Sequence, residues 1–488
     1  MKKNSITQPV VHLENANGYE YGLVFQQSLQ IAAHALMRIH GKGNERTWKI
    51  LLFRYVVTAI KYKSLFANVN HVPFDNIALR AEMSTSTCSG SVSKISKVLN
   101  AIKSLIKGII SPTTLTIPSG NYSFGIALPG DLLKEIPLNS RLLWLRPLNR
   151  KANMRSNLQK IANEIPDPFK KKIIENIPKV YVEYFDYYWN HIDVEKAGGI
   201  SFHVHFTIKD FLKEFVIAKC ILNGAKLYCY QHGGFYGELA EHFILDFERE
   251  IADRFVTWGW AYNIKDLPLG SDKLLKFKNR YQQFLTIGKV ERILLPLPYI
   301  RDDLARSSDF IDYLNFVLIR LANSIFRYNV CVRYRRDILD KEKSSAKSKI
   351  IDVEELGLKI DDFKVPSYES IKQSELVLLP THPSTMFLEC ISVDHPVIAI
   401  CPDTSLLHSN YLKQMQPLMT INLVFTSVEE AIDFLEKTNV EKWWKMVVTS
   451  SIYKKFKSSY ASTFDLKNEL DREGGIFDRA LQITAHRD

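Results

Sequence analysis

Residues 227–237 read LYCYQHGGFYG, and this stretch is the most informative one in the chain. Its apolar residues stop before His232, and the chain then turns on Gly233-Gly234 ahead of a polar run that is compatible with a helix. A buried strand, a glycine turn and a helix are typical of an open α/β sheet. Ligands of such sheets bind outside the carboxyl ends of the strands. The pattern predicts that His232 faces a ligand, and a loop histidine bonded to the backbone is the alternative.

The composition is that of a large, basic, globular protein. The chain has 488 residues, 46% of them hydrophobic, which is enough for two or three domains. It carries 64 Lys and Arg against 53 Asp and Glu, so the formal net charge is +11. This surplus favours anionic partners such as nucleotide phosphates, acidic glycans or anionic lipid headgroups. Because the basic residues are spread along the chain, we expect no nucleic-acid partner.

Neither a secretory signal nor an uncharged apolar stretch of about 18 residues is visible in the sequence. We therefore expect a cytoplasmic protein with peripheral contact to an anionic inner membrane. The six cysteines lack the spacing of a metal or disulfide framework, and most lie in apolar runs. They predict small, reduced core residues.

Alternating apolar runs and amphipathic segments predict two α/β halves, after a helical region at the N-terminus and before helices at the C-terminus. The expected domains are residues 1–275, residues 276–440 and a helical tail over 441–488 that packs back on the first domain. Residues 80–122 are expected to be mobile or partly exposed, and the Lys-rich residues 264–283 to be an interdomain linker. Expected helices are Tyr21–His40, Glu45–Phe66, Asp210–Asn223, Glu238–Glu250, Phe310–Phe326, Ser367–Gln373 and Ser384–Val393. Expected strands are Ala225–Tyr230, Arg254–Trp258, Arg292–Leu297, Val330–Tyr334, Leu376–Leu379 and Val397–Ile400.

A second candidate site lies in the strand–turn–helix segment that begins at Leu376. Ser384 or Thr385 opens its helix, and such a helix start offers free N–H groups and a positive dipole end to a phosphate. Glu389 lies one turn further on and is placed to reach a ribose or sugar hydroxyl, while His382 lies at the carboxyl edge of the strand. An ordinary capped helix with a loop histidine is the structural alternative.

Other candidate residues have a functional and a structural interpretation. Arg333, at the end of a predicted strand, is a candidate phosphate contact or part of a solvated basic strand end. Asp253 either orients His232 or caps a strand. Trp258 and Trp260, like the later pair Trp443-Trp444, are expected to be packing residues.

The sequence contains none of the Walker, GxGxxG, HExxH or GxSxG motifs in a suitable context. What remains is a two-domain enzyme that binds a nucleotide without a glycine-rich phosphate loop. The GT-B architecture, in which two Rossmann-like domains face each other across a cleft, fits that description. A base near the acceptor hydroxyl is then needed, and the usual histidine pKa of about 6.5 suits neutral pH.

The chain resembles a family of sugar transferases from bacterial O-antigen and surface-carbohydrate loci. The likeness is carried by NERTWKILLFRYV (44–56), FTIKDFLKEFVIAKCILNGAKLYCYQHGGFYG (206–237), EREIADRFVTWGW (248–260), LLPTHPSTMFLECISVDHPVIAI (378–400) and VEKWW (440–444). It implies a GT-B-like fold, with the acceptor in the first Rossmann-like domain and the nucleotide sugar in the second. A wider similarity to teichoic-acid and capsule transferases implies that His232 is the catalytic base. Similarity to Kdo and sialyl transferases implies that His382-Pro383 contacts a cytidine nucleotide, with a CMP-activated ulosonic acid as a candidate donor.

The predicted function is thus transfer of a sugar from a nucleotide-activated donor to a glycan or lipid-linked glycan acceptor in surface-polysaccharide or lipopolysaccharide assembly. His232 and Asp253 are the predicted catalytic residues. The predicted donor-binding residues are His382, Ser384, Thr385, Glu389 and Arg333. No metal or other cofactor is expected. The alternatives are a nucleotide-sugar epimerase-like enzyme, a glycerophosphotransferase-like enzyme, and a non-catalytic glycan-binding subunit.

Overall fold

The computed structural model describes residues 16–61, 115–117, 123–124, 152–194, 201–204, 211–283, 292–298, 308–334, 350–361 and 364–465. Internal contacts divide the chain into two units. We call Tyr19–Tyr230 with Phe243–Phe255 the N-terminal unit, and Gln231–His242 with Val256–Asp488 and Met1–Gly18 the C-terminal unit. The domain boundaries predicted after residues 275 and 440 stay predictions.

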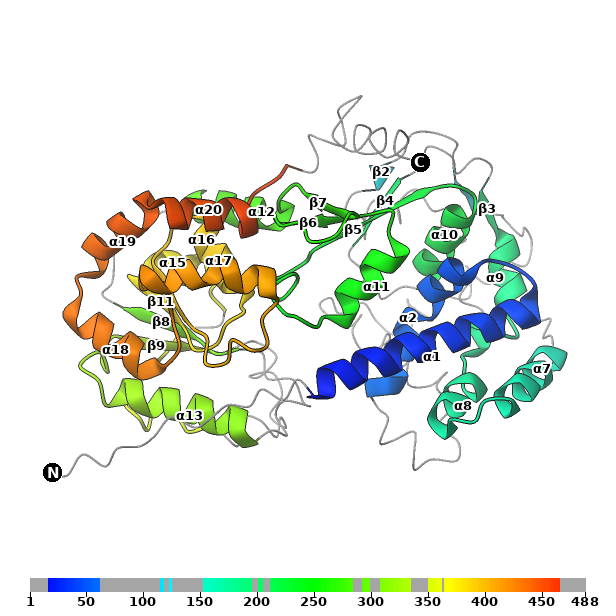
Figure 1. Cartoon of the computed structure of the whole chain (residues 1–488), viewed down its shortest axis with the longest axis horizontal. Helices are drawn as coiled ribbons and strands as arrows, with labels where there is room; N and C mark the ends of the chain where they lie inside the picture. Colours follow the sequence, from blue (N-terminus) through cyan, green and yellow to red (C-terminus); the bar gives the residue numbers. More distant parts are fainter. Residues whose placement is uncertain are drawn as a thin grey trace, which may run out of the picture. The chain divides into compact units, whose positions relative to one another are not determined.

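The N-terminal unit consists of helices and parallel strands (Figure 1). The apolar residues of α1 recur at helical spacing, and Phe25, Leu29 and Leu36 are fully buried. The predicted helix over 21–40 is confirmed, and the next one is confirmed as far as Lys61; residues 62–66 and most of 80–122 lie outside the described residues. The helices are α1 (Ala16–His40), α2 (Glu45–Lys61), α7 (Ala152–Asn163), α8 (Pro168–Glu175), the 3-10 helix η2 (Lys179–Tyr181), α9 (Phe185–His191), α10 (Phe211–Leu222) and α11 (Phe243–Ile251). The strands are β1 (Leu115–Ile117), β2 (Ser123–Phe124), β3 (Ile192–Val194), β4 (Ser201–Val204) and β5 (Lys226–Tyr230).

Strand β5, which leads into the motif at residues 231–237, is central to a sheet. Among the described residues this sheet has the order β2-β4-β5-β6-β7, where β6 is Arg254–Thr257 and β7 is Asp266–Pro268. Strand β4 pairs in parallel with β5, with Phe202 opposite Leu227. Four of the five residues of β5 are buried, which explains its uninterrupted apolar sequence.

A six-stranded parallel sheet forms the core of the described part of the C-terminal unit. Its order is β10-β9-β8-β11-β12-β13. Numbered along the chain, this is 3-2-1-4-5-6, the common order of the doubly wound nucleotide-binding fold. The strands are β8 (Ile293–Pro296), β9 (Val330–Arg333), β10 (Lys359–Ile360), β11 (Leu376–Leu379), β12 (Val397–Ile400) and β13 (Val424–Phe425). The predicted α/β class with Rossmann-like parallel sheets is therefore confirmed.

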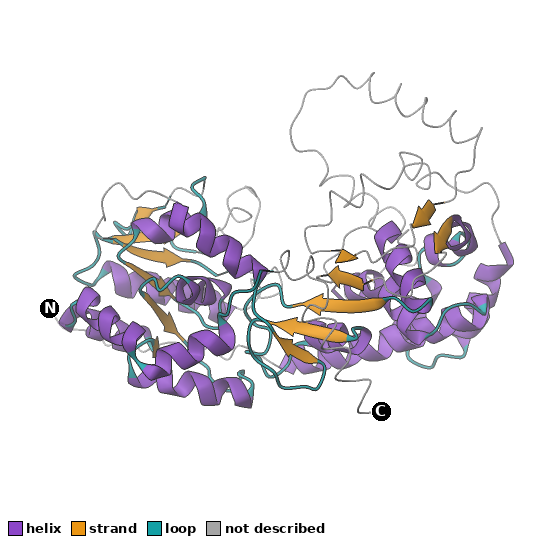
Figure 2. Cartoon of the chain, turned by 90° about the horizontal axis from the view of Figure 1, so that it is seen from above, coloured by secondary structure: helices purple, strands orange, loops and turns teal. Residues whose placement is uncertain are grey.

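Helices cover both faces of this sheet, as Figure 2 shows. Helices α13 and α18 lie together on one face, whereas α12, α15, α16, α17 and α20 lie on the other. These elements are α12 (Asp272–Gln283), α13 (Ser308–Ala322), α15 (Ser367–Gln373), α16 (Thr385–Ser392), α17 (Ser409–Thr420), α18 (Val428–Lys437), α19 (Val440–Thr449) and α20 (Ser451–Tyr460).

Two sequence predictions are wrong. Residues 264–283 are no linker, because they contain β7 and the amphipathic helix α12, which buries Leu274 and Phe277 and is capped by the Ser271 hydroxyl. The helix predicted from Glu238 begins five residues later, at Phe243. Phe235 (φ 76°) and Gly237 (φ 70°) have left-handed backbone conformations, which keep residues 234–238 in a turn instead of a helix.

The C-terminal helices are anchored by the tryptophans of the VEKWW segment. Both side chains are buried, and their indole N–H groups donate to backbone carbonyls: Trp443 to Ile421 (3.0 Å) and Trp444 to Asp394 (2.8 Å). Trp258 and Trp260 are also buried, so the predicted packing role of these tryptophans is confirmed. The five cysteines among the described residues are buried. None of the described helices is long and apolar enough to cross a bilayer.

Candidate functional site

Gln231 fixes the loop that follows β5, residues 231–237, which we call the QHGG loop. Its side chain is 2% exposed, and its Nε2 donates to the Gly233 carbonyl at 2.9 Å. Its Oε1 accepts the backbone N–H of Trp258 at 3.0 Å and the indole N–H of Trp260 at 2.9 Å. The buried side chain of Gln231 thus joins residues 231–237 to residues 257–260, and its backbone carbonyl also accepts the indole N–H of Trp258 at 3.0 Å.

His232 is half-buried and is held at both its ring and its backbone. Its Nδ1 is hydrogen-bonded to the Tyr236 hydroxyl at 2.8 Å, and its carbonyl accepts the ammonium of Lys273 at 3.2 Å. Burial, together with the charge of Lys273, lowers the pKa of His232 to about 4. The imidazole is therefore neutral at physiological pH. When its Nδ1–H donates to Tyr236, Nε2 carries the lone pair that a general base needs.

The loop lies directly against the start of α16. The N–H of Gly234 donates to the Thr385 hydroxyl at 2.8 Å. A Cβ on Gly234 would lie 2.8 Å from the backbone N of Thr385 and 2.9 Å from the carbonyl carbon of Ser384, so only glycine permits this approach. The sequence places the two candidate sites in different domains, whereas the structure brings them into contact within the C-terminal unit.

The N-terminus of α16 keeps hydrogen-bond donors available. Ser384 has the extended backbone of an N-cap residue, but its hydroxyl makes no capping bond. Among the described residues, no acceptor bonds the backbone N–H of Thr385 or of Met386, whereas the N–H of Phe387 donates to the Ser384 carbonyl. Free N–H groups and a positive dipole end favour an anion here.

His382 and Glu389 lie at different depths beside this helix start. His382 is 3% exposed, its Nε2 is 2.6 Å from the Tyr411 hydroxyl, and burial lowers its pKa to about 3. His382 is thus a neutral side chain in the core of the C-terminal unit. Glu389 is half-buried; burial raises its pKa, and the positive charge of Lys273 lowers it in part. The nucleotide and hydroxyl contacts predicted for these two residues stay predictions.

The strand order places this helix start where a ligand is expected. The order reverses between β8 and β11, and ligands of doubly wound sheets bind outside the carboxyl ends of the strands at that reversal. The loop from Pro380 to Ser384 leaves the carboxyl end of β11 and leads into α16. The candidate phosphate site predicted from sequence therefore lies at the switch point of the sheet.

Asp253 lies beside the start of β5 in the N-terminal unit. Its carboxylate accepts the backbone N–H of Leu227, at the start of β5, and the guanidinium of Arg46, both at 2.8 Å. These contacts favour the alternative in which Asp253 caps a strand, and its predicted orienting role stays a prediction.

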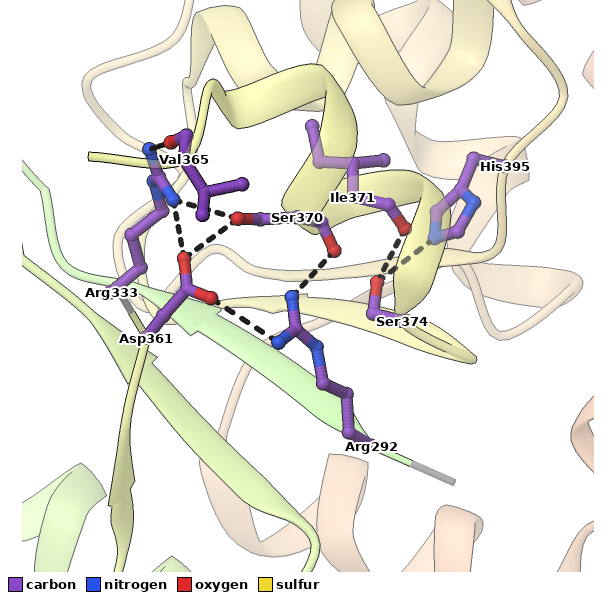
Figure 3. Close-up of polar contacts among 8 residues, drawn as sticks. All are labelled: Arg292, Arg333, Asp361, Val365, Ser370, Ile371, Ser374 and His395. Atoms are coloured by element: carbon purple, nitrogen blue, oxygen red, sulfur yellow. Dashed lines mark hydrogen bonds and ion pairs between the residues drawn. The ribbon is translucent and has the colours of Figure 1, made fainter. Parts of the chain in front are cut away.

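Arg333 belongs to a buried ion-pair network (Figure 3). Its guanidinium bonds the carboxylate of Asp361, the Ser370 hydroxyl (2.8 Å) and the Val365 carbonyl (2.7 Å). The other oxygen of Asp361 pairs with Arg292 at 3.2 Å. These contacts tie β9 and β10 to α15. Arg333 is thus not part of a solvated strand end, and the predicted phosphate contact stays a prediction.

Sequence reasoning missed two residues of the loop surroundings. Lys273 lies in residues 264–283, for which the sequence predicts a linker, although Ser271 as a cap and the spacing of Leu274 and Phe277 indicate a helix. Glu238 is fully buried, and its Oε2 accepts the N–H of Phe235 at 3.1 Å. Its Oε1 has no partner among the residues that the structure describes, and burial raises the pKa of Glu238 to about 8. Nothing in the sequence distinguishes this glutamate from an exposed one.

A model of the LIC12162 family transferases matches residues 24–471 of the chain, which includes the loop, α16 and the VEKWW segment. The chain belongs to the LIC12162 transferase family. It is accordingly a transferase. None of the curated proteins compared matches the chain.

Several solved structures are similar to this LIC12162 family member. The wall teichoic acid polymerase TagF is 11% identical, with a TM-score of 0.34 over 62% of this chain and 85% of that one. A protein described as a UDP-N-acetylglucosamine 2-epimerase from Listeria monocytogenes is 12% identical, with a TM-score of 0.33 over 55% and 77%. MurG from Acinetobacter baumannii is 9% identical, with a TM-score of 0.28 over 56% and 72%. The fold class rests on the sheets themselves.

Proposed function

We propose that this LIC12162 family transferase is a GT-B-type glycosyltransferase that moves a sugar from a nucleotide-activated donor to a glycan acceptor. The observation that carries the proposal is the start of α16 at the switch point of a doubly wound sheet, where the N–H groups of Thr385 and Met386 bond no acceptor within the described residues. A nucleotide phosphate is the anion that such a position suits.

The QHGG loop supplies the second requirement, a base beside the phosphate site. In the proposed reaction the acceptor hydroxyl attacks the anomeric carbon, the bond from that carbon to the phosphate oxygen breaks, and the nucleotide leaves. The proton of the hydroxyl passes to Nε2 of His232, which is neutral at physiological pH. Tyr236 holds the ring through Nδ1. The contact between Gly234 and Thr385 keeps the base and the phosphate site together.

The partners follow from the charge of the chain and from its resemblance. A net charge of +11 favours a phosphate-bearing donor and an anionic inner-membrane surface, where a lipid-linked surface-polysaccharide acceptor is presented. We propose that no metal is required, because the N–H groups of α16 supply positive potential to the departing phosphate.

A two-step experiment tests this function. A thermal-shift screen against CMP, UDP, GDP and dTDP identifies the nucleotide, and turnover of the matching labelled nucleotide sugar is then measured with and without membrane-derived glycan acceptor. A glycosyltransferase forms a labelled glycan only with acceptor. Turnover without acceptor indicates an epimerase-like enzyme, transfer from an activated glycerophosphate indicates a glycerophosphotransferase, and glycan binding without turnover indicates a binding subunit. Each of these three outcomes overturns the proposal.

A further inference from the structure

Lys273 lies in the first turn of α12 and reaches the QHGG loop. Its ammonium donates to the carbonyl of His232 at 3.2 Å and lies 5.9 Å from the ring centroid of Trp258. Helix α12 also packs against α16. A lysine on α12 is thus held beside the loop that contacts the start of α16.

Lys273 forms no ion pair within the described part of the chain. Among the described residues no carboxylate lies within 4.0 Å of its Nζ, whereas Lys276, one turn further along α12, pairs with Asp272 at 2.6 Å. The positive charge of Lys273 lowers the pKa of both His232 and Glu389, so its field reaches the loop and α16 alike. An anion bound between these elements would complete the charge balance.

The geometry points to Lys273 as the cation that binds the phosphate of the nucleotide donor, an inference that rests on the proposed glycosyl transfer. Lysine is a common phosphate ligand that acts as a compact charge. When the bond between the anomeric carbon and the phosphate oxygen breaks, negative charge grows on the leaving nucleotide. The ammonium of Lys273 and the N–H groups of Thr385 and Met386 then stabilise that charge.

If Lys273 binds the phosphate, its loss should weaken the binding of a nucleotide but not of the parent nucleoside. A lysine with a purely structural role would not distinguish these two ligands. Calorimetric titrations compare the wild type with the variants Lys273→Met, Lys273→Arg and, as a control on the same helix, Lys276→Met. The probes are the nucleotide found in the thermal-shift screen and its parent nucleoside, which lacks the phosphate. Lys273→Met should weaken nucleotide binding about 10–100-fold and leave nucleoside binding unchanged, because it removes one charge-assisted contact. Lys273→Arg should restore most of the loss, and Lys276→Met should bind as the wild type does.

The possible failures are distinguishable. A wild type that binds none of the nucleotides contradicts the proposed function itself. A wild type that binds nucleotide, with Lys273→Met binding it equally well, overturns the assignment of Lys273 alone. Equal weakening of nucleotide and nucleoside binding also overturns it, because that result means that Lys273 only supports the loop through the His232 carbonyl.

Discussion

Replacing Gln231 by leucine should destabilise the C-terminal unit without changing the volume of the site greatly. The change leaves three buried groups without their partner: the Gly233 carbonyl, the Trp258 N–H and the indole N–H of Trp260. Each unsatisfied buried group costs about 1–3 kcal/mol, so the loss is about 3 kcal/mol or more. For a unit of about 150–250 residues, 3 kcal/mol lowers Tm by about 6–12 °C.

Differential scanning fluorimetry measures this shift, with the exposed Gln282→Leu as the matched control that should leave Tm unchanged. Gln231→Glu adds a pH test. A neutral carboxyl can donate to Gly233 and accept from both tryptophans, whereas the ionised form faces the Gly233 carbonyl without a proton. The pKa of the introduced carboxyl is therefore raised in the folded state, so this variant should approach wild-type stability near pH 4 and lose it as pH rises. A Tm of Gln231→Leu within 2 °C of the wild type, or a pH-independent Gln231→Glu, would refute this reasoning.

Three further predictions concern the loop and the charge of the protein. His232→Ala should lower kcat by about 10²–10⁴-fold, and because the pKa of His232 is lowered to about 4, the wild-type rate should be flat above pH 5–6; a rate that still rises through pH 6–7 contradicts the environment described. The pKa of Glu238 is raised to about 8, so the folded state holds this proton more tightly than the unfolded chain. Wild-type stability should therefore fall relative to Glu238→Gln as pH rises from about 4.3 to 8, and parallel denaturation profiles would exclude this linkage. The protein should co-sediment with anionic vesicles in about 0.01 M salt and dissociate at about 0.15 M, where the Debye length shortens from about 30 to 8 Å; equal sedimentation with neutral vesicles would argue against membrane attraction.

Six of the sheet strands could be predicted from the sequence because each is a short apolar run between turn residues: β5, β6, β8, β9, β11 and β12. Leu376–Leu379 and Val397–Ile400 match the observed strands, since parallel strands are buried on both faces and carry no polar interruption. Helix α12 is hard to predict because only Leu274 and Phe277 are buried in it, and three of its twelve residues are lysines. The lysine-rich composition therefore favours a linker, although the spacing of the two apolar residues is that of a helix.

The candidate site could be predicted only as two separate halves. The glycine turn at residues 233–234 and the Ser/Thr-opened helix are local patterns, and both were found. Their contact depends on tertiary structure, because Gly234 and Thr385 are 151 residues apart in the sequence. No periodicity in the sequence predicts that the two segments meet. The pKa of His232 also depends on burial by distant segments and on Lys273, so the usual histidine value was the only one available from sequence.

The central claim is that the QHGG loop and the start of α16 form one nucleotide-binding site, and a calorimetric titration with CMP, UDP, GDP and dTDP tests it most directly. The wild type should bind one of these nucleotides. Gly234→Ala, whose Cβ would lie 2.8 Å from the backbone N of Thr385, should bind it at least about 10-fold more weakly. Gly22→Ala in α1, whose Cβ meets only ordinary contact at 3.4 Å, should bind as the wild type does. No binding of any of the four nucleotides to the wild type, or equal binding by a folded Gly234→Ala variant, would contradict the account.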